Sequence, residues 1–480
     1  MKLDHDSCYH ALKTHDVRFD GRFFVGVSST GIYCRPVCTA KLPRRENCAF
    51  FPSAAAAEQA GYRPCLRCRP ELAPGHASVD AMSRLARAAA GHWEDGLLGE
   101  VGVGEAAARL GVSDRHLRRV FHGEYGVTPI AFVQTQRLLL AKRLLTDTRL
   151  TITEVAFASG FTSLRRFNAL FKARYRMNPS DLRQSRASLP GDPVLYFELA
   201  YRPPLAWRAL LDFLGRRAVA GVEAVSDGVY RRVVNVSGTP AEQGGWIAVS
   251  HRPERATLRV GLSAGLAQAV PWVLARVKRL FDLSCDPTDI AARLGPLAAA
   301  DPGLRVPGAF DGFEVAVRAI LGQQITVAAA ITLAGRFAAR FGDPRLTPYP
   351  ALTHAFPQAG RIVAAGEDEI AGLGIVRTRA RAIRAVAQAL VDDAVTLEPG
   401  VDVTATLERL RALPGIGDWT AQYIAMRALA WPDAFPASDV GVRKALGGIS
   451  ARAAERAAAP WQPWRSYAVM HLWRSLEQQP

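Results

Sequence analysis

Two pairs of cysteines near the start of the chain have the spacing of a metal site. Cys34 and Cys38 are separated by three residues, and Cys65 and Cys68 by two. Each pair can lie on one turn and present two sulfur atoms about 2.3 Å from one ion, which suits tetrahedral Zn(II). We therefore expect one zinc ion held by four cysteine thiolates. The spacing alone favours a zinc ion that only stabilises the fold.

A second candidate site lies near the C-terminus, in the loop Leu413-Pro-Gly-Ile-Gly417. Its glycine spacing is typical of a helix-hairpin-helix turn, whose backbone N–H groups approach a DNA phosphate closely. Leu413, Gly415 and Gly417 are the predicted hairpin residues, and a monovalent cation is expected beside them. The loop alone predicts only a nonspecific grip on DNA.

The composition favours a polyanionic partner and a soluble protein. The formal charge is +16, and residues 1–190 hold 28 of the 60 basic but only 17 of the 44 acidic residues. A basic surface binds phosphates by releasing counterions, so we expect double-stranded DNA as a partner. The polar first ten residues resemble no secretion signal, and no apolar run reaches the roughly 18 residues that span a bilayer. We expect a cytoplasmic protein with no membrane partner.

The reducing cytoplasm also bears on the cysteines, because paired thiols there bind metal more often than they form disulfides. Cys8, Cys48 and Cys285 fit no ligand spacing and are predicted to be ordinary thiols.

The elements that must position these residues predict a multidomain α+β protein. Turn-rich sequence comes first, and its size indicates a small α/β domain that needs its metal. Helical periodicity follows, then short runs of β-branched and aromatic residues that indicate an antiparallel sheet, then helical periodicity again. We expect linkers at 71–76 and 185–193. The predicted domains are 1–76 (zinc-binding), 77–187 (all-α), 194–305 (antiparallel sheet subdomain) and 306–480 (all-α, with the hairpin).

Two related stretches of the second domain, 105–121 and 152–172, each show a helix, a glycine turn and a second helix. A long helix across 128–145 joins them, so the pattern predicts a tandem helix-turn-helix. Leu117, Phe121, Phe167 and Phe171 are expected in the core. The polar residues of the second helices are candidates for DNA contact, with a solvated surface charge as an equal alternative for each: Arg115, Arg118, Arg119, Arg165, Arg166, Asn168 and Lys172.

Gly31-Ile-Tyr-Cys34-Arg-Pro-Val-Cys38 and Gly61-Tyr-Arg-Pro-Cys65-Leu-Arg-Cys68 resemble the N-terminal domain of the Ada family of adaptive-response proteins. The tandem helix-turn-helix resembles the AraC family of transcription activators. The resemblance implies that Cys34 accepts a methyl group from a DNA methylphosphotriester while the other three cysteines only hold zinc. It also implies a switch that raises DNA affinity, with promoter DNA and RNA polymerase as partners. Nearby arginines would contact phosphates, among them Arg35, Arg45 and Arg67.

The stretches 413–421, 436–442 and 464–473 resemble the AlkA-type 3-methyladenine DNA glycosylases of the helix-hairpin-helix superfamily. The resemblance covers about residues 194–480 and implies that Asp439 is the catalytic carboxylate. Trp419, Tyr423 and Trp473 would line the pocket and hold a flipped, cationic alkylated purine by stacking and cation–π attraction. Core packing is the alternative role for each aromatic residue.

The chain also differs from the families that it resembles at positions that bear on the prediction. Bifunctional glycosylases place a lysine where this chain has Trp419, so strand cleavage through a Schiff base is not expected. No cysteine follows Cys285, so no iron–sulfur cluster is expected. Gln324 stands where the family often has a bulky apolar wedge. The Pro-Cys-His-Arg motif of methylguanine methyltransferases is missing, so direct O6-methylguanine repair is not expected.

These features predict a fused alkylation-response protein. It would combine a methyl-accepting zinc domain, a transcription activator and a monofunctional glycosylase that excises alkylated purines such as 3-methyladenine. Two alternatives remain. One is a glycosylase whose N-terminal half only targets DNA, with a structural zinc. The other is a regulator whose glycosylase half has lost catalysis.

Overall fold

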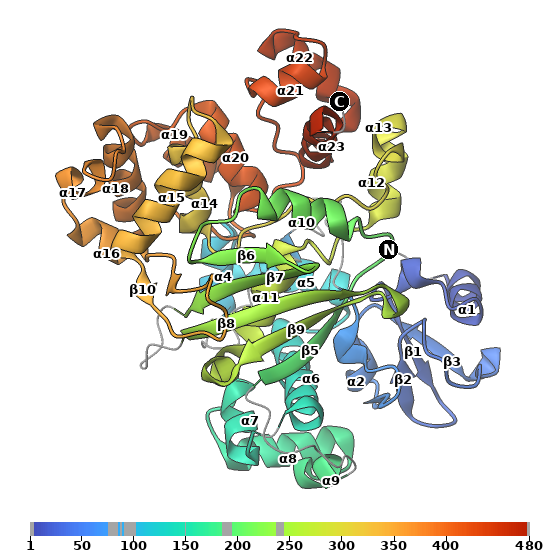
Figure 1. Cartoon of the computed structure of the whole chain (residues 1–480). Coiled ribbons are helices and arrows are strands. Elements are labelled where there is room, and N and C mark those ends of the chain that lie inside the picture. The colour runs from blue at the N-terminus through green and yellow to red at the C-terminus, as the bar shows by residue number, and fades with distance from the viewer. Residues whose placement is uncertain are drawn as a thin grey trace. The chain divides into compact units, whose positions relative to one another are not determined.

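The computed structural model describes residues 4–74, 85–86, 89–90, 102–148, 150–184, 194–236 and 244–477. It divides into two compact units, which are described separately. The first contains Met1–Pro203, Arg252–Ala275 and Leu283–Cys285, and the second contains Pro204–His251, Arg276–Asp282 and Asp286–Pro480. Figure 1 labels the elements of both.

The first unit begins with a four-stranded sheet in the order β3-β1-β2-β4. β1 pairs antiparallel with β2 and β3, while β4 runs parallel to β2. Ser53 caps the second of the two flanking helices by accepting a hydrogen bond from the backbone of Ala56. The elements are α1 (His5–Lys13), β1 (Phe24–Val27), β2 (Ile32–Cys34), β3 (Cys48–Phe51), α2 (Ala54–Gln59), β4 (Arg63–Pro64) and η3 (Pro70–Leu72).

The prediction that a linker begins at residue 71 is wrong. Glu71 lies in η3, and its buried carboxylate accepts from Lys142 at 2.6 Å and from Arg69 at 3.0 Å. A buried carboxylate is tolerated only when it is paired. The partner lysine lies 71 residues away in sequence, where no local pattern signals it. Residues 75–76 and the second expected linker, 185–193, lie outside the described residues.

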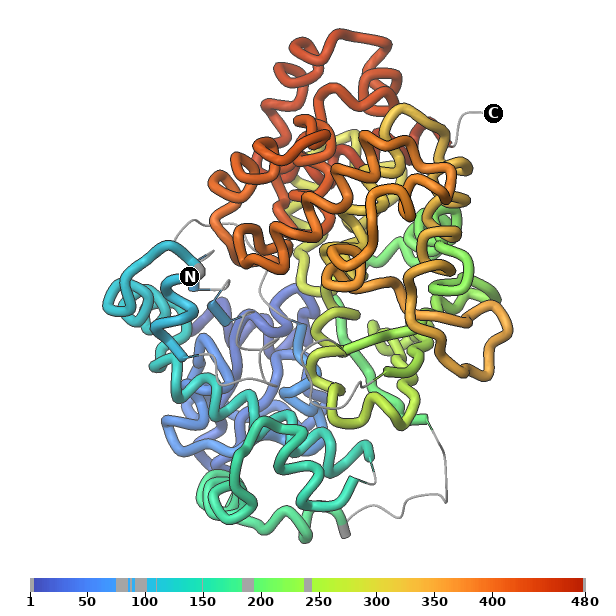
Figure 2. Tube along the Cα trace, turned by 90° about the vertical axis from the view of Figure 1, so that its left-hand side faces the viewer, coloured from blue at the N-terminus to red at the C-terminus, as the bar shows by residue number. Residues whose placement is uncertain are grey.

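The tandem helix-turn-helix follows and is confirmed, with the predicted long helix between its two halves (Figure 2). Gly111 and Gly160 turn the chain at φ +67° and +81°. Glycine enters this region of backbone conformation at little cost. The predicted core residues Leu117, Phe121, Phe167 and Phe171 are fully buried. The helices are α4 (Val103–Arg109), α5 (Asp114–Tyr125), α6 (Pro129–Asp147), α7 (Ile152–Ala158), α8 (Leu164–Tyr175) and α9 (Pro179–Gln184).

A buried carboxyl group ties the small sheet to the helical part of this unit. Glu58 of α2 accepts from the hydroxyls of Tyr33 (3.1 Å) and Thr135 (3.0 Å), which belong to β2 and α6. Burial raises the pKa of Glu58 to about 7, although both hydrogen bonds oppose the rise.

This raised pKa predicts a pH-dependent stability. Between about pH 4.5 and 7 the unfolded chain releases the Glu58 proton and the folded chain keeps it, so stability falls as pH rises through this window. The full change is about 3 kcal/mol. Thermal unfolding across about pH 5 to 8 should show the fall in the unsubstituted protein, and Glu58→Gln should remove this part of it. Parallel curves for the two proteins would contradict the prediction.

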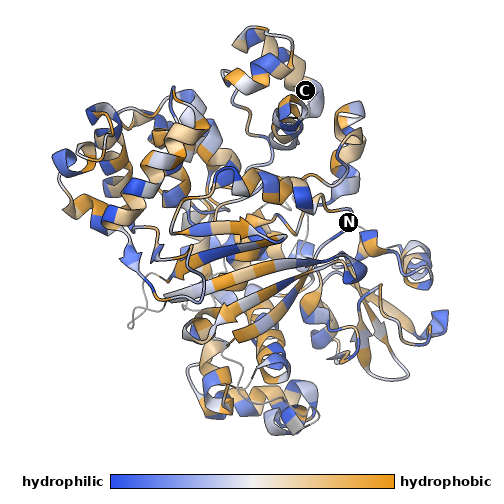
Figure 3. Cartoon of the chain, viewed as in Figure 1, coloured by the Kyte–Doolittle hydropathy of each residue, from blue (hydrophilic) through white to orange (hydrophobic). Residues whose placement is uncertain are grey.

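The predicted antiparallel sheet is confirmed as a five-stranded sheet in the order β5-β9-β8-β7-β6. Hydrophobic and hydrophilic colours alternate along its strands (Figure 3), as expected for a sheet with one face in the core. The short strand β6 was not predicted, because its first residue is the buried, ion-paired Glu223 and breaks the apolar pattern. The strands are β5 (Val194–Ala200), β6 (Glu223–Ser226), β7 (Val229–Asn235), β8 (Gly244–Arg252) and β9 (Thr257–Ser263).

Beyond its strands, the second unit is mainly helical, as predicted. Most side chains of α14 are buried, and this helix packs against α15, α18 and α20 in a bundle that Figure 1 shows clearly. In the described part of the chain, no helix is long and apolar enough to span a membrane. Outside the five-stranded sheet, the helices that carry or support the candidate site are α10 (Trp207–Gly215), α14 (Gly312–Leu321), α15 (Val327–Phe341), α16 (Ala359–Ala364), α18 (Arg377–Val391), α19 (Val403–Ala412), α20 (Asp418–Arg427), α21 (Val440–Ala445) and α23 (Arg465–Glu477).

Candidate zinc centre and base-excision site

The parallel pairing of β2 and β4 brings the two cysteine pairs together. Tyr33 is opposite Pro64, and the Cys65 N–H donates to the Tyr33 carbonyl at 3.0 Å, so Cys34 and Cys65 follow neighbouring residues of the two strands. Local turns then return the second member of each pair toward the first. Sequence spacing predicted the two pairs, and the sheet joins them.

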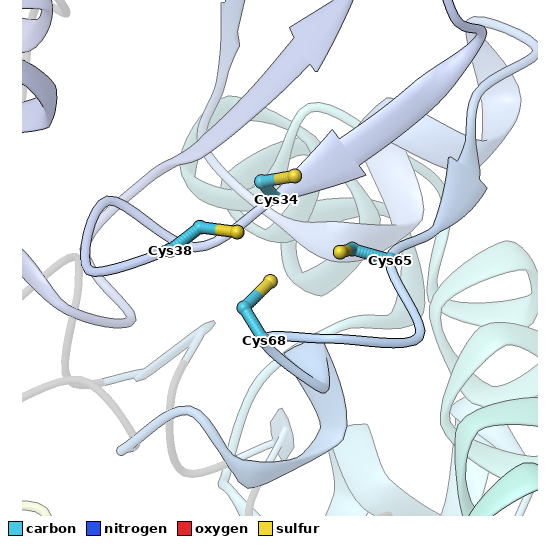
Figure 4. A group of neighbouring side chains, drawn as sticks. All are labelled: Cys34, Cys38, Cys65 and Cys68. Atoms are coloured by element: carbon cyan, nitrogen blue, oxygen red, sulfur yellow. The ribbon is translucent and has the colours of Figure 1, made fainter. Parts of the chain in front are cut away.

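The four sulfur atoms converge on one point (Figure 4) and lie within 4.8 Å of one another. A tetrahedron of thiolates around zinc has sulfur–sulfur separations of about 3.8 Å, so the donor set fits this ion. Cys38 and Cys65 are buried, whereas Cys34 and Cys68 are partly exposed. The predicted ordinary thiols Cys8, Cys48 and Cys285 are buried and lie outside the cluster.

Arg35 is not available to DNA in this structure, and the prediction that it contacts a phosphate is wrong. Only 8% of it is exposed, and its guanidinium donates to Asp20 at 2.8 Å and to the Cys68 carbonyl at 3.2 Å. Its backbone N–H points at the Cys68 sulfur at 3.4 Å. Arg35 therefore supports the metal site. Arg45 and Arg67 are exposed, although Arg45 forms an ion pair with Asp6.

The seven candidate DNA-contact residues of the helix-turn-helix units are all exposed, on α5 and α8. Arg118 forms an ion pair with Asp114 at 2.8 Å, and Arg119 lies 3.1 Å from the His116 ring. Arg118 and Arg166 line one groove of about 310 Å³, together with Ile130 of α6. The second helices of the two units, α5 and α8, which we call the recognition helices, thus border a common surface.

The predicted catalytic carboxylate lies at the start of α21. Asp439 is the N-cap, and its Oδ1 accepts from the backbone N–H of Val442 at 2.8 Å. Two indole groups complete its environment: Trp473 Nε1 donates to Oδ1 at 2.9 Å, and Trp419 Nε1 donates to Oδ2 at 2.8 Å. The structure therefore brings together a carboxylate and two aromatic residues that the sequence separates by 20 and 34 positions.

Four aromatic rings gather around this carboxylate. Trp419 and Tyr423, one turn apart on α20, stack with centroids 5.4 Å apart, and Tyr423 lies 6.3 Å from Trp473. Phe213 of α10 stacks on Trp473 with an interplanar angle of 14°. Phe213 was not predicted, because it lies in an amphipathic helix far from the hairpin in the sequence and carries no local signal.

Arginines lie beside the aromatic cluster. Arg427 donates to the Tyr423 hydroxyl at 2.9 Å. Burial would raise the pKa of that phenol, but the charges of Arg427, Arg217 and Arg318 lower it below its ordinary value. The hydrogen bond from Arg427 thereby fixes the Tyr423 hydroxyl within the aromatic cluster.

The hairpin forms as predicted between α19 and α20. Gly415 has φ +77°, and Gly415 and Gly417 are exposed while Leu413 is half-buried. Gln323 braces the loop by donating to the Gly415 carbonyl and the Thr420 hydroxyl, both at 2.9 Å. Its neighbour Gln324, at the wedge position, is exposed and has φ +54°.

Comparison with known proteins gives the class of each part. Residues 7–71 match the metal binding domain of Ada and 106–185 a helix-turn-helix domain. Residues 196–311 match the AlkA N-terminal domain and 317–459 the HhH-GPD superfamily of base excision DNA repair proteins. A base-excision glycosylase of the helix-hairpin-helix class is therefore joined to an Ada-type zinc domain, whose four thiolates hold one zinc ion.

One relative matches nearly the whole chain, and two others each match one part of it. A probable bifunctional transcriptional activator/DNA repair enzyme AlkA from Mycobacterium tuberculosis is 38% identical over 99% of this chain and 97% of its own length. DNA-3-methyladenine glycosylase 2 of Escherichia coli is 38% identical over 59% of this chain and 99% of its own. The bifunctional activator/repair enzyme Ada of the same organism is 35% identical over 28% of this chain and 37% of its own. The chain belongs to the family of bifunctional transcriptional activator/DNA repair enzymes AlkA.

Proposed function

We propose that the C-terminal half hydrolyses the N-glycosidic bond of alkylated purines such as 3-methyladenine. The observation that carries this proposal is the carboxylate of Asp439, held by two indole N–H groups within a cluster of aromatic rings. An alkylated purine is cationic, so electron-rich rings attract it, and its charge makes it a good leaving group.

In this mechanism Trp419, Tyr423 and Trp473 bind the flipped base. Asp439 stabilises the positive charge that develops on the sugar and orients or deprotonates the attacking water. Water adds to the anomeric carbon, the glycosidic bond breaks, and the neutral base leaves. Because Trp419 stands at the lysine position of bifunctional enzymes, the product is an intact strand with an abasic site.

We also propose that Cys34 accepts a methyl group from a DNA methylphosphotriester. Cys34 and Cys68 are the two partly exposed ligands, and the likeness to the Ada family assigns the acceptor to the first cysteine of the first pair. The S–CH3 bond forms as the O–CH3 bond breaks, which leaves a thioether and restores the phosphodiester anion. Zinc keeps the thiols deprotonated at neutral pH. The competing view, that the zinc is purely structural, predicts no transfer.

Methylation removes one negative charge from the site and should raise its affinity for DNA. Exposed Arg45 and Arg67 and the recognition helices supply the cationic surface. We expect each added phosphate contact to steepen the dependence of log K on log salt by roughly one unit. Titration of methylated and unmethylated protein with a promoter duplex measures this. Equal slopes and affinities would contradict the switch.

We further propose four domains, with the limits 1–76, 77–187, 194–305 and 306–480. We also propose promoter DNA and RNA polymerase as partners.

The test of the glycosylase uses the full chain and duplex DNA treated with a methylating agent. Chromatography should detect released 3-methyladenine, and the strands should break only after alkali. Borohydride trapping of a covalent DNA adduct would contradict hydrolysis without strand cleavage, and release of no base would contradict the glycosylase.

A further inference from the structure

Three donors from three segments hold the Asp439 carboxylate. The Val442 N–H and the Trp473 indole both donate to Oδ1, and the Trp419 indole donates to Oδ2. A single backbone bond would leave the carboxylate free to turn about it. Donors on both oxygens fix its plane, and charge-assisted hydrogen bonds of this kind are stronger than neutral ones.

Gly441, two residues beyond Asp439, lies against the edge of Trp473. A Cβ at this position would lie 3.1 Å from Trp473 Cδ1, 3.2 Å from Trp473 Nε1 and 3.1 Å from Asp439 Oδ1. These separations are closer than ordinary van der Waals contact. Gly441 does not have the positive φ that favours glycine, so the close neighbours disfavour a side chain there, and the backbone conformation does not.

A face of the Trp473 ring is also occupied. The buried ring of Phe213 stacks on it with centroids 6.3 Å apart, and the Arg217 guanidinium lies 3.9 Å from the Phe213 ring centroid. Phe213 therefore limits movement of Trp473 toward that face when a group is added at position 441. An added methyl group would lengthen or turn the bond between its indole N–H and the carboxylate.

We propose that Gly441 is a positioning residue of the glycosylase. By leaving out a side chain, it lets the Trp473 indole reach Asp439. One tryptophan then both lines the base pocket and orients the carboxylate, so occupation of the pocket is coupled to the geometry of the charge that acts on the sugar. This inference rests on the proposed glycosylase function. It adds that Gly441, which has no side chain, sets the position of the Trp473 indole.

The test is a mutant cycle in the full-length protein with single-turnover excision from methylated duplex DNA. Gly441→Ala should lower the rate constant at saturating enzyme about tenfold or more, the scale of one hydrogen bond to a charged group. The enzyme concentration that gives half of this rate should stay within about twofold. Trp473→Phe, which keeps a ring and removes the donor, should lower the rate constant in the same way.

The double variant decides whether Gly441 acts through the indole. If it does, Gly441→Ala should have almost no further effect in the Trp473→Phe protein, because the bond it disturbs is already gone. Gly360→Ala is the matched control, since nothing lies within 4 Å of a Cβ there, and it should behave as wild type. Additive losses in the double variant, or a weaker half-saturation with an unchanged maximal rate, would overturn the inference.

The same assay separates this inference from the function on which it rests. If the unsubstituted protein excises the base and Asp439→Asn does not, while Gly441→Ala matches its control, only the positioning role is wrong. If Asp439→Asn excises normally, the proposed catalytic carboxylate itself is wrong.

Discussion

Asp439→Asn is expected to lower base excision by a factor on the order of 100 or more, the scale seen when one preorganised electrostatic stabiliser is lost. The amide keeps the shape of the side chain and still caps α21, because asparagine is as good an N-cap as aspartate. It removes the charge that opposes the developing cation on the sugar. DNA binding should be largely intact, because the hairpin between Leu413 and Gly417 is untouched.

Asp402→Asn is the matched control for this substitution. Asp402 caps α19 by accepting from the Ala405 N–H at 3.1 Å, in the same way that Asp439 caps α21, but within the described part of the chain it accepts no hydrogen bond from the clustered aromatic side chains. Excision by this variant should equal that of the unsubstituted protein. Excision of 3-methyladenine by Asp439→Asn at near wild-type rate would refute the catalytic role of this carboxylate.

Substitution in the zinc centre is expected to produce the second large effect. Cys34→Ser should abolish methyl transfer, because a serine hydroxyl is not ionised at neutral pH and is a far weaker nucleophile than a zinc thiolate. Peptide mapping of the unsubstituted protein after exposure to methylated DNA should find S-methylcysteine at position 34 alone. A methyl group on Cys38, Cys65 or Cys68 would overturn the assignment.

Cys65→Ser should in addition unfold the zinc domain. A structural zinc ion supplies about 10 kcal/mol or more of folding free energy. Cys65 is a buried ligand that directly follows β4. Zinc content and thermal unfolding measure this loss. Cys48→Ala, a change at a buried thiol outside the cluster, should keep the zinc. A Cys65→Ser protein that retains one equivalent of zinc would contradict the ligand assignment.

The sequence by itself determined the parts of this protein whose information is local. Cysteine spacing predicted two ligand pairs, because a ligand pair closes within one turn. Helical periodicity predicted the tandem helix-turn-helix and placed Leu117 and Phe167 in its core, because a helix repeats its buried face every three to four residues. The glycines of the hairpin predicted its turn, because a turn is also set by residues close together in the sequence.

Only the tertiary structure decided which distant residues meet. Arg35 is buried against Asp20, so it is no longer a candidate DNA contact. Glu71, which was expected in a linker, is paired with Lys142 instead. The tertiary structure also placed Phe213 on a face of the Trp473 ring and Gly441 at its edge. The physical reason is that burial and ion pairing depend on contacts between segments far apart in the chain, and no period or spacing within one segment records them.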